Sequence, residues 1–408
     1  MKRVLIIGGG PSGFTTAILA KNENTEVKIL ERNSSSLKKL LMTGNGKCNY
    51  FNDAYSISNY HSANIEKVEE FITDKNLLEV RDFFDFLGIV PKVKNGYYYP
   101  FSMQASTVKN ALEEASRACG VEVVNNCLVT EIHKKENGFS VICDEKEITC
   151  DVLVLACGSK ACPKTGSDGM GYSFLKKLGH TIISPVPALV QLIGEGDYFK
   201  KWDGVRSEVS LKLLEDGKSI SESHGEIQLT DYGLSGICVF DLSHEVSRGL
   251  LDGKKEVIQI NFVPFVEDFY SWFDQYSRKH SNKNIQDLLE GFLNFKLVSV
   301  ILERSSLSCS SFYSNLSEEE KRVLCQNLES FSVPIVGTKG FLSCQVCNGG
   351  VSLDEVSLST MESLKVKDLY IVGELLDING NCGGYNLTTC WISGLLAGKR
   401  IGEEHGSN

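Results

Sequence analysis

The 408-residue sequence is short of several features that mark common protein classes. No stretch reaches about 18 consecutive apolar residues, so we expect no membrane span. No long run of lysine or arginine is present and the formal net charge is −10, which argues against a basic face that binds nucleic acid. Internal repeats and low-complexity segments are also absent. The length and the ordinary composition predict a cytoplasmic protein of two or three globular domains.

Known catalytic and metal-binding motifs are missing as well. The chain has no H-E-x-x-H, P-loop or EF-hand pattern, and none of its 7 histidines lies in a recognisable motif. Cys344 and Cys347 form one C-x-x-C pair, but no second pair with suitable spacing completes a zinc site, so we predict no metal. Many of the 14 cysteines lie in apolar, strand-like runs, where we expect reduced thiols that act as small hydrophobic residues.

What the sequence does contain is a glycine fingerprint near its start. Residues 4–13 read VLIIGGGPSG, an apolar run followed by Gly8, Gly10 and Gly13 at G-x-G-x-x-G spacing. The first glycine permits a tight turn, the second lets the backbone approach a pyrophosphate, and the third lets the next helix pack closely. A second strand ends in Glu31, whose carboxylate can bind a ribose hydroxyl. This order predicts a dinucleotide site, whereas a simple glycine-rich turn before a core helix leaves Glu31 unexplained.

Beyond this βαβ unit, the sequence pattern divides the chain into four stretches. Helices and strands follow one another up to about residue 185. They include DVLVLA (151–156), whose apolar residues after Asp151 predict a central strand. Strand-like runs separated by turns then dominate as far as residue 265, and polar, amphipathic helices occupy 266–330. Strands return at about 331–345, and a buried strand and a last helix follow after residue 368.

We therefore predict an α/β fold in which one domain is interrupted. The chain leaves the first domain at about residue 185 and re-enters it at about residue 346. The inserted segment holds two further domains, one mainly β and one helical. The predicted boundaries are 1–185 and 346–408 for the interrupted Rossmann-like domain, 186–265 with about 331–345 for the β-rich domain, and 266–330 for the helical domain.

Four further segments, together with the fingerprint, carry a resemblance that spans nearly the whole chain. They read KLLMTGNGKCNYFN (39–52), LACGSKACPKTGSDGMGY (155–172), EIQLTDYGLSG (226–236) and GELLDINGNCGGYNLTTCWISG (373–394). With these segments the sequence resembles the bacterial flavoproteins described as aminoacetone-oxidase-like or bile-acid-inducible NAD(P)/FAD-dependent oxidoreductases. The resemblance implies FAD at the N-terminal Rossmann site. It also implies a discontinuous FAD-binding domain, interrupted by a β-barrel-like domain and a small helical domain.

The return of the chain to its first domain supports FAD on independent grounds. A strand, loop and helix over 369–396 rejoin a fold begun at residue 4. Flavoproteins use such a returning segment to cover the ribityl chain and the flavin ring. The helix that follows GGYN can direct its positive N-terminal end toward the N1–C2=O edge of the ring, where it would stabilise the anionic reduced flavin.

The resemblance also implies a set of contacts for each part of FAD. The pyrophosphate is expected to contact Gly8, Gly10, Pro11, Ser12 and Gly13. The adenosine side is expected to contact Glu31 at the ribose, Arg32 and the Val129 backbone at the adenine, and Ala156, Cys157 and Gly158. The flavin ring is expected near Gly44, Asn45, Gly46, Lys47, Cys48 and Asn49. The ribityl chain and ring are expected near Gly373, Glu374, Asp377, Gly383, Gly384, Tyr385 and Asn386.

Some of these positions have simpler interpretations. The glycines could serve only turns, and Asp377 and Asn386 could serve only as caps. Lys47 stands where the family often has arginine, and an ammonium is not equivalent to a planar guanidinium in a bidentate contact.

Two residues are candidates for chemistry beside the flavin. Cys48 is a single cysteine in a region where flavin disulfide reductases carry a C-x-x-x-x-C pair. This argues against a dithiol mechanism and leaves either a single-cysteine redox site or a loop residue packed by the flavin. Tyr385 can act as a phenolic proton donor, since reduction of an enone needs a hydride at the β-carbon and a proton at the α-carbon. The aromatic run GYYYP (96–100) with Phe101 predicts either a substrate pocket or an ordinary strand.

Three functions remain open from the sequence. The first, which we predict, is reduction of an activated C=C bond in a small substrate, such as a steroid or bile acid, with NAD(P)H as a transient hydride donor to FAD. No second G-x-G-x-x-G marks a nicotinamide domain, so the donor would have to dock at the flavin face. The second is an FAD-dependent amine oxidase of the aminoacetone type. The third is a flavin-binding redox sensor without turnover.

Overall fold

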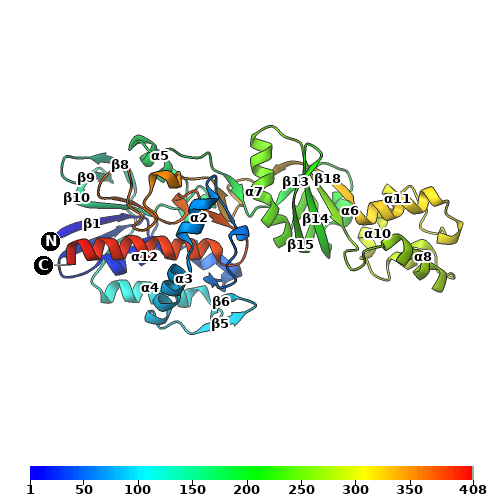
Figure 1. Cartoon of the computed structure of the whole chain (residues 1–408), viewed down its shortest axis with the longest axis horizontal. Helices are drawn as coiled ribbons and strands as arrows, with labels where there is room; N and C mark the ends of the chain where they lie inside the picture. The colour runs from blue at the N-terminus through cyan, green and yellow to red at the C-terminus, as the bar shows by residue number, and fades with distance from the viewer. Residues whose placement is uncertain (407–408) are drawn as a thin grey trace. The chain divides into compact units, whose positions relative to one another are not determined.

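The computed structural model describes residues 1–406 and forms two compact units (Figure 1). The first unit contains Met1–Pro185 and the chain from Val346 onward, and the second contains Val186–Gln345. The first unit is therefore discontinuous in sequence, with the second inserted into it. Each unit has a hydrophobic core of its own.

A five-stranded parallel sheet forms the centre of the first unit. Its order is β20-β11-β1-β2-β7, with bounds β1 (Lys2–Ile7), β2 (Thr25–Leu30), β7 (Glu122–Val124), β11 (Val152–Leu155) and β20 (Leu369–Ile371). Residues 4–7 of β1 are all buried, as expected for a strand covered on both faces. The chain moves from β1 to β2 on one side and later reaches β11 on the other. The strand order thus reverses at β1, which is where doubly wound sheets bind their ligands.

The first and last helices pack along each other beside this sheet (Figure 1). α1 (Pro11–Ala20) follows β1, and α12 (Tyr385–Gly406) ends the described chain. Their contact is close because glycines recur every four residues on α12, at Gly394, Gly398 and Gly402. A Cβ at Gly398 would lie 2.7 Å from Leu19 Cβ and 2.8 Å from Thr16 O. These glycines let the two helix backbones approach, so the C-terminal helix completes a domain begun at the N-terminus.

Smaller elements surround the central sheet in this unit. The remaining helices are α2 (Ile65–Phe71), α3 (Asp74–Phe86), α4 (Ala105–Ala118) and α5 (Met170–Lys177). One antiparallel sheet has the order β10-β9-β8, with β8 (Val129–Lys134), β9 (Phe139–Cys143) and β10 (Lys146–Cys150). Another has the order β3-β6-β5, with β3 (Phe51–Asn52), β5 (Pro91–Lys94) and β6 (Tyr97–Pro100). Two short strands, β4 (Tyr60–His61) and β21 (Asn379–Gly380), pair with each other.

The expectation that all cysteines are reduced is wrong for one pair. Cys127 and Cys143 form a disulfide with a Cα–Cα distance of 5.9 Å. The antiparallel register of β8 and β9 places Cys143 opposite Val129, two residues from Cys127. That proximity is a product of strand pairing, and the cysteine spacing alone does not reveal it.

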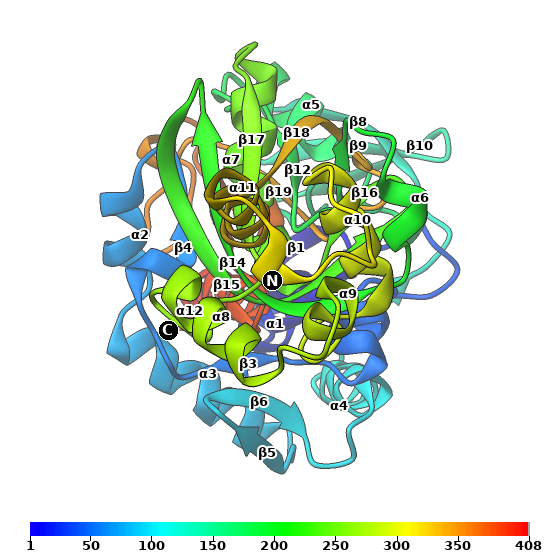
Figure 2. The same ribbon diagram turned by 90° about the vertical axis from the view of Figure 1, so that its right-hand side faces the viewer.

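The second unit is built on a closed barrel with the strand order β13-β16-β15-β14-β17-β18. Its strands are β13 (Leu192–Gly194), β14 (Arg206–Glu215), β15 (Lys218–Thr230), β16 (Gly233–Ser235), β17 (Glu256–Asn261) and β18 (Phe331–Thr338). α7 (Ile237–Leu251) packs against it. Between β17 and β18 the chain forms α8 (Phe269–Lys279), α9 (Ile285–Leu289), α10 (Phe295–Arg304) and α11 (Glu318–Glu329), which are labelled in Figure 2. Ser317 and Glu320 make a capping box at the start of α11, where the sequence predicts a helix start.

One carboxyl group in the barrel is buried without any hydrogen bond among the described residues. Glu256 begins β17 and is 2% exposed, and both of its carboxyl oxygens lack a partner there. A Cβ at Gly249 of α7 would lie 1.8 Å from its Oε1, so only glycine leaves room for this side chain. Burial, and after it the charge of Glu215, raise the pKa of Glu256 to about 7.

Because of the buried Glu256 carboxyl, we expect the protein to lose stability as the pH rises from about 4.5 to about 7. Asp216 and Glu245 also raise the pKa of Glu256, while Lys254, paired with Glu215 at 2.6 Å, lowers it. Because the folded-state pKa lies above the ordinary 4.5, folding favours the protonated acid, and this contribution fades as pH rises through about 7. Between about pH 5 and pH 8.5, the free energy of unfolding of the wild type should fall by about 2 kcal/mol more than that of Glu256→Gln. Urea unfolding of the full chain measures this, and parallel pH profiles for the two proteins would contradict it.

Candidate functional site

The parallel sheet places the predicted nucleotide loops at one edge. All five strands run the same way, so the loops after β1, β11 and β20 lie together at their carboxyl ends. Gly8 has φ +112°, and a Cβ there would lie 2.3 Å from Ala156 O. A Cβ at Gly13 would lie 2.2 Å from Gly8 O. Both glycines are therefore required by the close packing of the loop after β1, of α1 and of the loop after β11.

Gly10, in contrast, faces open space. No atom lies within 4 Å of the place where its Cβ would be. α1 begins directly after it with Pro11, and its first turn has neither an acidic residue nor a side-chain cap. The N–H groups and the positive end of this helix are thus available for an anion, and the backbone leaves room for one. This arrangement fits the pyrophosphate of a dinucleotide.

Glu31 lies at the end of β2 with its carboxylate held in place. It is 7% exposed, and its Oε2 accepts a hydrogen bond from Gly9 N at 2.9 Å. Its Oε1 accepts from the backbone and side-chain nitrogens of Asn33 at 2.8 and 2.7 Å. A carboxylate has about four lone-pair positions, so capacity remains for a ribose hydroxyl. Arg32 is paired with Asp168, and the Val129 backbone pairs with β9.

Within the segment 39–49, Leu40–Gly46 folds as a distorted 3₁₀ turn. Thr43, Gly44 and Asn45 leave the helical conformation inside this turn, and Gly44 and Asn45 have φ of +56° and +54°. Residues 44–47 are exposed. Asn49 Oδ1, however, is buried with no hydrogen-bond partner in the described chain. A buried amide oxygen without a donor indicates that a bound group completes this site.

The glycine-rich loop before α12 lies against the same segment. A Cβ at Gly384 would lie 3.0 Å from Asn49 Oδ1, and Gly383 and Gly384 have φ of +136° and +95°. Asn386 donates to Gly380 O at 2.7 Å and accepts from Gly380 N at 2.9 Å. Its amide therefore fixes the loop.

Asp377 has a similar structural role at the start of this loop. It is 2% exposed, and its Oδ2 accepts from Ser62 Oγ at 3.0 Å and from Ala63 N at 2.8 Å. These bonds tie the loop to the chain that leads into α2.

The two candidates for chemistry, Cys48 and Tyr385, are held by burial and by hydrogen bonds respectively. Burial raises the pKa of the Cys48 thiol to about 12, although a hydrogen bond from Thr43 lowers it, so the thiol is neutral at physiological pH. The Tyr385 hydroxyl accepts from Asn59 Nδ2 at 3.1 Å and is within 3.3 Å of Ala54 O, to which it donates. Neither group has the free, activated form that a nucleophile or a mobile proton donor needs.

Replacing Cys48 should therefore leave flavin reduction nearly unchanged. A neutral, fully buried thiol is a poor nucleophile, and serine keeps its size and its hydrogen bond. We expect the rate of flavin reduction in Cys48→Ser to stay within about threefold of the wild type, measured anaerobically by stopped-flow absorbance. A loss of several orders of magnitude would establish a thiol mechanism.

The aromatic run on β6 is divided between two faces. Tyr98 points toward the core and donates to Asp53 Oδ2 at 2.9 Å. Tyr97 and Tyr99 lie on the other face, because side chains alternate along a strand. A Cβ at Gly383 would meet Tyr97 Cε1 at 2.7 Å, and a Cβ at Gly44 would meet Tyr99 Cε1 at 3.6 Å. These two rings thus border the two glycine-rich segments predicted to hold the flavin.

Several site residues were not predicted from the sequence. Lys39 and Ser159 both contact Glu374, at 2.5 and 2.8 Å, and Asn33 supports Glu31. Lys39 opens the motif KLLMTGNGKCN, which is the signal that could have identified it. The other two are ordinary polar residues whose partners are distant in sequence or lie within a short turn.

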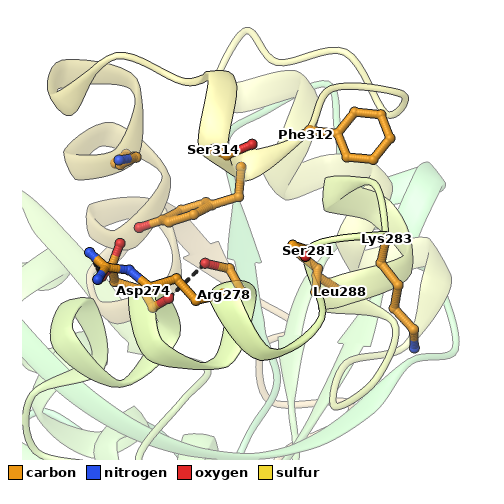
Figure 3. A pocket seen from close by; sticks show the side chains of 10 residues that line it. Asp274, Arg278, Ser281, Lys283, Leu288, Phe312 and Ser314 are labelled. Carbon is orange, nitrogen blue, oxygen red and sulfur yellow. Dashed lines mark hydrogen bonds and ion pairs between the residues drawn. The ribbon is translucent and has the colours of Figure 1, made fainter.

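A separate hollow of about 340 Å³ lies in the second unit (Figure 3). Its walls come from α8, α9, α11 and the segment 312–314, and Figure 3 shows Asp274 and Arg278 side by side on α8. These two side chains form an ion pair of 2.8 Å. No residue of the predicted nucleotide site lines this hollow.

Comparison with known proteins places this architecture in a family. A model described as "HI0933-like protein Rossmann domain" matches residues 2–400. The chain belongs to the HI0933-like family. One relative, the 3-dehydro-bile acid delta(4,6)-reductase of Clostridium scindens, is 37% identical over 407 residues, which cover 99% of this chain and 100% of that protein. The ribosomal RNA dihydrouridine synthase of Escherichia coli is 25% identical over 391 residues, which cover 95% of each chain.

Solved structures show the same fold. The 3-ketosteroid-delta4-(5alpha)-dehydrogenase from Rhodococcus jostii RHA1 aligns with a TM-score of 0.50 and 12% identity, over 100% of this chain and 97% of that one. A flavocytochrome c3 fumarate reductase also aligns with a TM-score of 0.50 and 12% identity, over 100% of this chain and 79% of that one.

These findings confirm the predicted α/β, Rossmann-like fold class, and one of the relatives is named as a reductase. The aminoacetone-oxidase part of the predicted resemblance is not confirmed. Among residues 1–406, no helix is long and apolar enough to cross a membrane.

Proposed function

We propose that this protein reduces an activated C=C bond in a steroid or bile-acid-like substrate, with NAD(P)H as the hydride donor. The observation that carries the proposal is the 37% identity to a bile acid delta(4,6)-reductase over that protein's whole length. The match covers 99% of this chain and therefore includes both units. The substrate itself remains a proposal for this chain.

A shared chemistry strengthens this choice. A delta(4,6)-reductase saturates C=C bonds conjugated with a carbonyl group. Formation of dihydrouridine from uridine also adds two hydrogens across a C=C bond conjugated with a carbonyl. The names of both relatives therefore describe the same type of reaction, reduction of a conjugated C=C bond, on different substrates. The net charge of −10 favours the small substrate over ribosomal RNA for this chain.

In this proposal, different residues at the sheet edge bind different parts of FAD. Gly10 and the first turn of α1 hold the pyrophosphate, and Glu31 holds the adenosine ribose, with the other predicted contacts around them. Asn49 Oδ1 accepts a hydrogen bond from the bound cofactor. Bound FAD would supply the hydride-transfer chemistry between NAD(P)H and the β-carbon of the substrate.

Tyr97 and Tyr99 are our candidates for the substrate wall. Both rings border the glycine-rich segments from one face of β6, and they offer the flat apolar surface that a steroid-like ring system needs. Burial, and then the neighbouring Tyr97, raise the pKa of Tyr99, so its hydroxyl stays protonated and can donate a proton to the α-carbon. We place Tyr99 before Tyr385 in this role, because the Tyr385 hydroxyl already has two partners.

The anaerobic visible spectrum of the purified protein tests the proposal. Rapid bleaching of the flavin band on addition of NADPH or NADH is the expected result. A flavin that ignores both nucleotides but is bleached by an amine would favour the amine oxidase. A flavin that no organic donor reduces at a useful rate would favour the redox sensor, and either result would overturn the reductase.

A further inference from the structure

Three backbone segments meet at the side chain of Glu374. Glu374 lies in a 3₁₀ turn (Gly373–Leu375) directly after β20. Its Oε2 accepts from Lys39 Nζ at 2.5 Å, where the chain enters the turn 40–46, and from Ser159 Oγ at 2.8 Å, in the loop after β11. One carboxylate oxygen thus connects the turn 40–46 to two of the loops at the carboxyl edge of the sheet.

We propose that Lys39 is a positioning residue for FAD, acting through Glu374. The inference rests on the proposed function insofar as that function requires FAD at this edge. Lys39 fixes the segment 39–49, which carries the glycines and Asn49 predicted to approach the flavin. It also fixes the direction of the Glu374 carboxylate. Loss of Lys39 should weaken FAD binding more than it weakens the fold.

The place of the pair beside the phosphate loop favours this role. A Cβ at Gly373 would lie 2.5 Å from Ser12 Oγ, in the first turn of α1. Glu374 therefore follows a residue that touches the predicted pyrophosphate site. Within residues 1–406, no group donates to Glu374 Oε1, so this oxygen is available to a hydroxyl of a bound ligand.

Removing one partner of the Lys39–Glu374 ion pair is expected to be unfavourable, because both side chains are mostly buried. The Lys39 and Glu374 side chains are 24% and 19% exposed. Burial lowers the pKa of Lys39, but the charge and the hydrogen bond of Glu374 outweigh it and leave the pKa raised. The ammonium thus remains charged. Without the Lys39 ammonium, Glu374 would keep only its hydrogen bond from Ser159. Its carboxylate would then be mostly buried and without a counter-charge, which favours rearrangement of the surrounding loops.

Lys39, and not Lys47, is the lysine of this segment with a fixed partner. Lys47 occupies the position where the resemblance suggests an arginine. It is exposed and has no ion pair with any residue of the described chain. Lys39, and not Lys47, is therefore the charged residue that holds this segment in position.

Affinity for FAD in the full-length protein, stripped of cofactor and titrated with FAD, tests the role. The test variant is Lys39→Met, and the conservative variant is Lys39→Arg. The matched control is Lys365→Met, which breaks an ion pair with Glu355, also of 2.5 Å and in the same unit, away from the predicted site. The melting temperature of each FAD-free protein is measured in parallel, because a purely structural role would lower that temperature and leave the affinity unchanged.

We expect the dissociation constant of FAD to rise at least about tenfold in Lys39→Met and less than about threefold in Lys39→Arg and Lys365→Met. In a double-mutant cycle, adding Lys39→Met to Glu374→Gln should weaken binding no further, because the two residues act as one unit. Equal affinities in Lys39→Met and Lys365→Met would overturn the inference. If Lys39→Met does not fold, Lys39→Gln replaces it under the same criteria. A wild type that binds no FAD would instead overturn the proposed function, and the inference with it.

Discussion

We expect Gly10→Glu to yield a folded protein that no longer retains FAD. The glutamate side chain enters the open space beside the first turn of α1, where the pyrophosphate is proposed to bind. It fills that space and places a negative charge at the helix end that stabilises the phosphates. We expect FAD affinity to fall at least about a hundredfold, roughly 3 kcal/mol of binding free energy. The ratio of flavin to protein absorbance after purification measures the loss.

The fold should tolerate this change, because no atom lies within 4 Å of the Gly10 Cβ position. The melting temperature of the FAD-free variant is therefore expected to match that of the FAD-free wild type. Ser106→Glu, in the first turn of α4, introduces the same charge at another helix start and should keep the flavin. A yellow Gly10→Glu protein would contradict the assignment of this loop to the pyrophosphate.

Gly398→Leu should destabilise the first unit by about 3 kcal/mol. The new side chain would meet Leu19 Cβ at 2.7 Å and the Thr16 carbonyl at 2.8 Å, and a backbone carbonyl cannot move aside without displacing α1. Because α1 begins at the phosphate loop, FAD retention should fall together with stability. Thermal unfolding measures the first effect, with an expected decrease of about 10 °C in melting temperature.

Glu403→Leu is the control for this substitution. Glu403 lies on the same helix and is exposed, so the same side chain meets no packed neighbour there. Its melting temperature should differ from the wild type by less than about 2 °C. Equal decreases in melting temperature for Gly398→Leu and Glu403→Leu would show that the close packing of α1 on α12 does not govern stability.

The features predicted well from the sequence are those that follow from local steric rules. Gly8 and Gly13 are fixed by atoms of neighbouring loops, and their spacing in the chain records that requirement. The alternation of side chains along β6 is also a local rule, and it separates Tyr97 and Tyr99 from Tyr98. The aromatic run at 96–100, for which the sequence left a substrate pocket or an ordinary strand open, forms a strand with its rings on opposite faces.

The features that the sequence did not reveal are contacts between distant segments. Lys39 and Glu374 are separated by 335 positions, and nothing local to either residue identifies its partner. The disulfide between Cys127 and Cys143 depends on the register of β8 and β9. The buried carboxyl of Glu256 occupies a space left by Gly249 on another element. Each of these depends on tertiary contacts, whereas composition and periodicity describe only one segment at a time.

Hydride transfer through bound FAD to a conjugated C=C bond is measured most directly in a single turnover without oxygen. The FAD-loaded protein is reduced with NADPH or NADH and then mixed with a 3-oxo steroid that has double bonds at C4 and C6. We expect the flavin absorbance to return at a rate that depends on steroid concentration, and mass spectrometry to find a product with two additional hydrogen atoms. A flavin that stays reduced in the presence of the steroid, yet is reoxidised at once by oxygen, would contradict this expectation.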